Sequence, residues 1–303
     1  DLLDRSQRGL NKLTPEEVNS LSRLYRAATS DLALAQRDFP RERVTIYLNQ
    51  LVARAHAVIY RSEPLATNRL IRFVTTGFPR TFRESLPFFL VAALFLILPA
   101  LASGFWAARQ PEAAIWLLPP QAQRLIPMIE RQELWTTIAV NERPYASAFI
   151  MRNNIQVSIL AFGSGILAGV VTLWLMIFNG LLLGGITGLT IYHDVGFELW
   201  TFVIGHGVIE LSVIFIAGGS GLMLGWALLQ PGLLRRRDAL ILAAQKAVWL
   251  IIGCIPLLVI AGLIEGFISP AETLPWPVKW SVGLVSGVIL YSYLFLAGRE
   301  KRR

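Results

Sequence analysis

The sequence predicts an all-α polytopic membrane protein with about six transmembrane helices and an N-terminal cytoplasmic helical hairpin. Three observations predict this fold class. Of the 303 residues, 54% are hydrophobic and 16% are charged, a balance typical of membrane proteins rather than of soluble domains. Charge is densest in the segment 1–85, which holds 23 of the 48 Asp, Glu, Lys and Arg residues. Beyond it lie five apolar runs, each about long enough to cross a hydrocarbon core of about 30 Å.

Residues 1–65 are expected to form the hairpin. Thr14-Pro15-Glu16-Glu17 predicts a helix start, with Thr14 as N-cap, Pro15 at the first helical position and a glutamate closing a capping box. The helix should run to about Arg37, and a second helix should follow over residues 43–61, because both stretches place apolar residues at steps of three and four. We expect His56 to be a packed histidine rather than a metal ligand.

Residues 66–85 interleave aromatic and aliphatic side chains with arginines. This pattern is typical of an amphipathic segment at a membrane surface. We expect it to lie on the inner leaflet and to anchor the chain.

Residues 86–303 are expected to form the membrane domain. Its long apolar runs are residues 87–107, 155–178, 199–226, 239–267 and 278–296. A sixth run, 180–192, is short and would be tilted, broken or re-entrant. Asn179-Gly180 is then interpreted as the turn between two spans. An interfacial outer loop is expected over residues 108–152.

Basic residues predict the orientation, because cytoplasmic flanks of membrane proteins are rich in Lys and Arg. Arginines precede the first span, residues 235–237 follow the fourth and Arg299 follows the sixth. With six spans these clusters share one side, so both termini are expected in the cytoplasm, with the protein in an inner membrane or a single plasma membrane. The flanks also account for the formal charge of +8. The partners expected are therefore the lipid bilayer and no nucleic acid.

Small residues recur through the apolar runs and predict close helix packing. Gly207, Gly218, Gly219 and Gly221 are the candidate packing positions in the fourth run. Gly218-Gly219-Ser220-Gly221 could also break that helix, as a kink or as unwound backbone lining a cavity. A homodimer through small-residue faces is expected.

The candidate functional site is an intramembrane polar cluster. His206 and Glu210 are four residues apart and share one face of a helix. Asn153, Asn154 and Asn179 are its candidate partners; one of the first two is expected to cap its helix and the other to face a neighbour.

Three interpretations of this cluster stay open. It could lock helices together by hydrogen bonds, it could line a transport or proton pathway, or it could bind a metal ion such as zinc. Whether a metal binds is left unknown, and no cofactor is expected. The sequence holds no phosphate loop, nucleophile elbow, dinucleotide fingerprint or His-Glu-x-x-His pattern. We therefore expect no enzyme activity.

Several motifs resemble the stage II sporulation protein M family. The most specific is His206-Gly207-Val208-Ile209-Glu210-Leu211 after Glu198-Leu199-Trp200. The others are Leu24-Tyr25-Arg26 with Asp31-Leu32, the stretch from Tyr47-Leu48-Asn49 to Ala55-His56, Arg152-Asn153-Asn154 and Asn179-Gly180.

The resemblance implies a multispanning protein that anchors and localises a peptidoglycan-degrading complex with two partner proteins. We therefore expect a membrane scaffold for envelope or cell-wall-remodelling partners, such as a peptidoglycan hydrolase. The alternative is a small-solute or ion transporter that uses His206 and Glu210.

Overall fold

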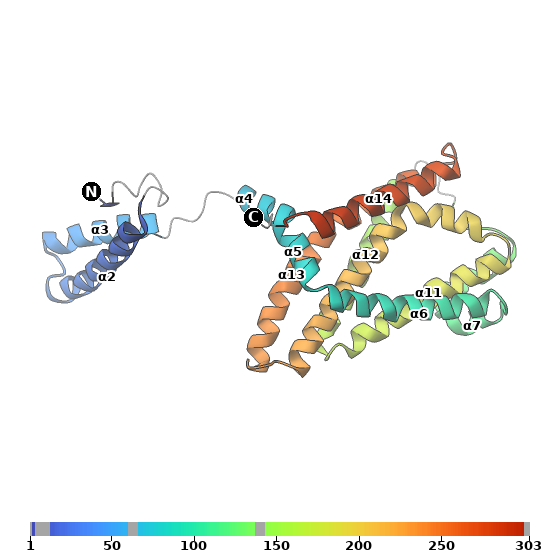
Figure 1. Cartoon of the computed structure of the whole chain (residues 1–303), viewed down its shortest axis with the longest axis horizontal. Coiled ribbons are helices and arrows are strands. Elements are labelled where there is room, and N and C mark those ends of the chain that lie inside the picture. The colour runs from blue at the N-terminus through green and yellow to red at the C-terminus, as the bar shows by residue number, and fades with distance from the viewer. Residues whose placement is uncertain (1, 4–12, 60–65, 137–142, 300–303) are drawn as a thin grey trace. The chain divides into compact units, whose positions relative to one another are not determined.

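The computed structural model describes residues 2–3, 13–59, 66–136 and 143–299, and every regular element in these ranges is a helix (Figure 1). The chain divides into two compact units, Asp1–Arg69 and Leu70–Arg303. We describe each unit by itself.

The first unit is the predicted hairpin, formed by α2 (Pro15–Asp38) and α3 (Arg43–Ile59). The predicted capping box is present, since the Thr14 hydroxyl accepts from the Glu17 amide and the Glu17 carboxylate accepts from the Thr14 amide. The Thr45 hydroxyl donates to the Phe39 carbonyl at 2.6 Å and closes the turn. His56 bonds to the Tyr25 hydroxyl at 2.9 Å, across the two helices.

The second unit is a polytopic helical membrane domain. Within the described residues, five of its helices are long and apolar enough to cross a bilayer, and α10 (Arg143–Gly163) contributes a shorter apolar stretch. The five are α6 (Leu86–Ala107), α11 (Val170–Tyr192), α12 (Gly196–Leu229), α13 (Arg236–Leu263), which continues as a π-helical turn η4 (Ile264–Ile268), and α14 (Trp276–Leu296).

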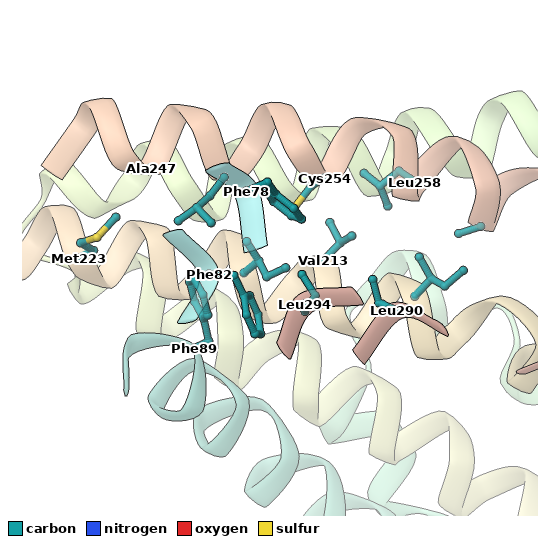
Figure 2. Close-up of a cluster of buried hydrophobic side chains, with 14 of the residues drawn as sticks. Phe78, Phe82, Phe89, Val213, Met223, Ala247, Cys254, Leu258, Leu290 and Leu294 are labelled. Atoms are coloured by element: carbon teal, nitrogen blue, oxygen red, sulfur yellow. The ribbon is translucent and has the colours of Figure 1, made fainter. Parts of the chain in front are cut away.

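Helix α12 is the centre of this domain. It contacts α6, α10, α11, α13 and α14. Half of its most apolar stretch is buried within the protein, which is the largest buried share among the five spans. Figure 2 shows a core cluster in which Val213 and Met223 of α12 pack with Cys254 of α13 and Leu294 of α14. Cys254 is thus a packing residue.

The starts and ends of the helices gather at two ends of the domain. Arg83 donates to the carbonyls of Leu294 and Ala297, so the chain before α6 lies beside the end of α14. The turn before α11 packs against Gly225 near the end of α12. We call this the basic end, because the arginine clusters lie on its segments, and the opposite end, with the α11–α12 turn, the loop end.

The segment before α6 packs deeper than expected. After α4 (Ala66–Arg72) and a π-helical turn, Phe78 and Phe82 of α5 (Phe78–Glu84) are only 3% and 5% exposed. Both belong to the core cluster in Figure 2. Their aromatic rings therefore stabilise α5 against α13 and α14 rather than resting on lipid headgroups.

The predicted turn at Asn179-Gly180 is wrong, because both residues lie in the middle of α11. The chain reverses instead at residues 167–169, where Ala168 and Gly169 adopt positive φ of 55° and 77°. A turn needs backbone that leaves the helical region, and this glycine supplies it. The short run 180–192 is consequently the second half of one full-length helix, α11, whose first half overlaps the predicted run 155–178.

The predicted break in α12 is also absent from the described chain, since α12 is continuous through Gly218 and Gly221. These glycines serve close packing instead. A Cβ on Gly218 would meet Met176, one on Gly219 would meet Phe89, and one on Gly221 would overlap the Ala161 carbonyl. Gly207 differs, because a Cβ there would meet Val203 of its own helix.

Residues 113–130 of the expected outer loop form three short helices, α7 (Ala113–Leu117), α8 (Pro120–Gln123) and α9 (Ile126–Glu130). Their apolar side chains bury Leu189 at the end of α11 and Val195 in the following turn. The loop is shorter than predicted, since α10 begins at Arg143 rather than after residue 152.

Candidate functional site

The candidate site is a cluster of His206, Glu210 and Glu265 inside the membrane domain. One ligand atom from each residue lies within 4.8 Å of the others. His206 and Glu210 are one turn apart on α12, as their spacing predicts. Glu265 comes from the π-helical turn at the end of α13, a kind of element often found at functional sites.

The imidazole of His206 is fixed on two sides. Its Nδ1 bonds to the Ser269 hydroxyl at 3.0 Å, and its ring meets Phe202 edge to face. Nε2 consequently faces Glu265, whose Oε1 is 3.7 Å away. The His206 side chain is 4% exposed and that of Glu265 is 8% exposed, so this pair is held away from bulk solvent.

Glu210 is held by α10. Its Oε1 accepts from the Asn154 side-chain amide at 2.6 Å. Asn154 lies inside α10, so it does not cap that helix. Of the two predicted roles for this pair, Asn154 has the other one, because its side chain faces a neighbouring helix. The backbone of Asn153 is likewise inside α10, and its side chain lies outside the described residues.

Asn179 does not reach this cluster. Its amide donates to the Leu175 carbonyl at 2.8 Å, one turn earlier in α11. The hydrogen-bonding amide of Asn179 is therefore satisfied within its own helix.

Glu265 was missing from the predicted site because it follows His206 by 59 positions and lies near the end of its apolar run. Spacing along a sequence reveals neighbours on one helix, whereas this contact depends on how α13 packs against α12. The available signal was a carboxylate near the end of an otherwise apolar stretch.

The charges of the cluster are only partly matched by protein groups. Within the described part of the chain, neither Glu210 nor Glu265 has a Lys or Arg within ion-pair distance. Glu265 Oε2 is buried and, among the described atoms, has no hydrogen-bond partner. A buried carboxylate oxygen without a partner is costly, and such an atom therefore invites a proton or a cation.

A polar cavity of about 260 Å³ adjoins the cluster on the side that faces the loop end. Its wall includes Phe202 and Ser269, both of which contact His206. Glu198 and Glu272 also line it, together with Lys279, whose ammonium donates to the Ser269 carbonyl. The side chains of Phe202 and Ser269 lie between this polar cavity and the buried imidazole of His206, since each of them lines the cavity and contacts the ring.

Comparisons with known proteins gave two family-model matches. The family model of Stage II sporulation protein M matches residues 78–270, which contain Asn154, His206, Glu210, Glu265 and Ser269. A domain of unknown function, DUF8413, matches residues 1–61, so the motifs around Leu24 and Tyr47 fall in a separate match. Comparisons with curated proteins and with solved structures gave no match. Because the first match covers more than half of the chain, this protein belongs to the stage II sporulation protein M family.

Proposed function

We propose that this protein is a membrane scaffold that anchors envelope or cell-wall-remodelling partners, such as a peptidoglycan hydrolase. One observation carries the proposal: the N-terminal unit exposes apolar side chains that its two helices leave uncovered. Large apolar residues about half exposed or more in this unit are Leu24, Leu34, Phe39, Val44, Ile46 and Tyr47. Exposed apolar surface on a small unit favours protein docking.

The packing of the membrane domain supports an anchoring role. A Cβ on Gly180, Gly184 or Gly188 of α11 would overlap backbone carbonyls of α6. Helices that touch through their backbones have little room to slide or rock. A rigid anchor that carries a separate docking unit is the arrangement a scaffold requires.

The experiment tests docking in the full-length chain. The tagged protein is purified from native membranes in mild detergent, and co-purifying proteins are identified by mass spectrometry. Ile46 and Tyr47 are 55% and 62% exposed, so the Ile46→Lys, Tyr47→Lys double variant should keep its fold. Asn49→Lys, Gln50→Lys is the matched control, because it adds the same charge at exposed positions of α3.

We expect a cell-wall hydrolase or another envelope protein to accompany the wild type and the control and to be lost from the apolar-to-lysine variant. A wild type that purifies alone contradicts the scaffold proposal. So does a partner that all three forms retain equally.

A small-solute or ion transporter is the second candidate, favoured by the cavity that adjoins His206. For this function Glu210→Gln should abolish proton or ion flux into proteoliposomes while the protein still assembles. Glu112→Gln, at an exposed position before α7, is the control. Equal flux in Glu210→Gln and wild type would exclude this candidate.

We further propose a bacterial inner membrane location with both termini cytoplasmic. If α10 is counted as a crossing, the arginine clusters before α6, at residues 235–237 and at Arg299 share the basic end, which the positive-inside rule places in the cytoplasm.

Homodimerisation also stays a proposal. Gly180, Gly184 and Gly188 of α11 pack against α6 within the chain.

A further inference from the structure

We propose that His206, Glu210 and Glu265 bind one divalent transition-metal ion, Zn²⁺ or Mn²⁺, inside the membrane domain. This site goes beyond the scaffold function and does not depend on it. The ion would tie the centre of α12 to the end of α13, and through Asn154 to α10.

The three side chains offer a suitable donor set. One imidazole nitrogen and two carboxylate oxygens lie within 4.8 Å of one another. The 3.7 Å between His206 Nε2 and Glu265 Oε1 is long for a hydrogen bond. It is close to the separation of about 3.3 Å between two ligands that each lie about 2.0–2.1 Å from a tetrahedral zinc ion.

The second shell already orients these donors. Ser269 bonds Nδ1 of His206 and so presents Nε2 to Glu265. Asn154 bonds one oxygen of Glu210. Metal-binding histidines and carboxylates are typically held in this way by outer partners, which fix the ring orientation and raise ligand affinity.

Charge gives an independent reason for a cation. Two ionised glutamates this deeply placed would carry two negative charges, with no Lys or Arg in ion-pair contact among the described residues. Glu265 is 6% exposed, and its Oε2 has no hydrogen-bond partner among the described atoms. A divalent ion would neutralise both carboxylates and would bond directly to oxygens that otherwise face a desolvation cost.

The ligand types favour a transition metal over Mg²⁺ or Ca²⁺. Imidazole suits zinc and its neighbours, whereas carboxylates also suit Mn²⁺. Ca²⁺ requires six to eight oxygen ligands, and Mg²⁺ keeps most of its waters. Three protein ligands with room for water are sufficient for Zn²⁺. The cavity at the loop end, with Glu198 and Glu272 in its wall, offers the ion a polar approach to His206.

The test measures metal binding by the full-length protein, purified in detergent with an affinity tag that holds no histidine. The protein is stripped with EDTA, incubated with Zn²⁺ or Mn²⁺, and separated from unbound ion by gel filtration. Bound metal is counted by mass spectrometry, and the thermal unfolding midpoint is recorded with and without the ion. We expect one ion per chain and a midpoint raised by the ion.

Variants test whether the ion binds at this cluster. Asn154→Leu should weaken binding by about 10–100-fold, as loss of a second-shell partner does. Glu265→Gln and Glu210→Gln should each weaken it further, because each removes a ligand charge. Glu112→Gln, at an exposed position before α7 and away from the lining of this cavity, should bind as the wild type does.

Two results would overturn the proposal. A wild type that retains neither Zn²⁺ nor Mn²⁺ would show that the glutamates hold protons instead, and this arm needs no variant to fold. Equal binding by wild type and folded Glu265→Gln would place the ion elsewhere. Neither result bears on partner recruitment by α3, so the failures of the two proposals are distinguishable.

Discussion

At the scale of single residues, two asparagines in apolar helices differ in what they hold. Asn154 donates across helices to Glu210, whereas Asn179 donates to the Leu175 carbonyl of its own helix. Removing the Asn154 amide leaves a Glu210 carboxylate oxygen without its partner. Removing the Asn179 amide leaves the Leu175 carbonyl, which still accepts the backbone hydrogen bond of its own helix.

We therefore predict that Asn154→Leu lowers the free energy of unfolding by about 1 kcal/mol, the usual size of an interhelical hydrogen bond in membranes. Asn179→Leu, the matched control, should cost less. Unfolding by SDS titration in mixed micelles measures both. Equal losses would mean that the Asn154–Glu210 bond contributes nothing specific to stability.

The composition of the site shows how far residue spacing reaches. His206 and Glu210 were predictable as one face of a helix, because i and i+4 always face the same way. That Asn154 faces a neighbouring helix was one of two alternatives in the sequence. Glu265 and Ser269 joined the site only through the packing of α13 on α12, which no local spacing encodes.

At the scale of elements, α6 and α11 pack through a four-residue repeat of glycines. Gly180, Gly184 and Gly188 of α11 lie against the carbonyls of Leu96, Ala100 and Gly104 of α6. Positions four apart share a face, so one stripe of α11 lies on the α6 backbone. The two helices run side by side in Figure 1.

A methyl group on this stripe should separate the helices. Gly184→Ala is expected to lower the unfolding free energy by about 1–3 kcal/mol, the usual cost of overpacking. Gly163→Ala is the control, because a Cβ there would meet nothing within 4 Å, and it should leave stability unchanged. Thermal unfolding in detergent compares them. Equal midpoints would contradict the close α6–α11 contact.

Glu84 at the end of α5 joins two elements through charge. Its carboxylate accepts from Arg80 Nε at 2.9 Å and lies 3.6 Å from Lys246 Nζ of α13. The hydrogen bond from Arg80, with a smaller contribution from Lys246, lowers the pKa of the Glu84 carboxyl below its usual value. Because the folded state favours the ionised form, stability is gained above the unfolded pKa of about 4.3 and lost as pH falls through the lowered pKa.

Glu84→Gln should therefore destabilise the protein at neutral pH by about 1 kcal/mol or less, since the group is 43% exposed and its ion pairs are screened by solvent. The difference from wild type should vanish in acid, below the lowered pKa of this carboxyl. Unfolding midpoints across a pH series report it, with Glu112→Gln as control. A difference that persists in acid would assign the effect to packing instead.

At the scale of the whole molecule, the two ends of the membrane domain should face different compartments. Leu233 lies fully exposed in the α12–α13 turn at the basic end, and Trp116 is 85% exposed on α7 at the loop end. Cys254 is the single cysteine and is buried, so the wild type should label weakly with a thiol reagent.

We predict that a membrane-impermeant maleimide labels Trp116→Cys from the outside of intact cells or spheroplasts, and labels Leu233→Cys only after the membrane is opened. The positive-inside rule gives this direction. The reverse pattern would invert the proposed orientation. Labelling of both from outside would mean that the number of crossings between residues 116 and 233 is even.

The sequence alone determined that this is a helical membrane protein, with a capped hairpin before it and a His-Glu pair on one helical face. Apolar content, capping residues and helical spacing are local properties, so they can be read without a fold. Tertiary structure decided where the chain reverses before α11, why α12 stays unbroken, and that Glu265 and Ser269 meet His206. In these three cases the outcome depends on which helix surfaces meet, and that is set by packing across the whole membrane domain.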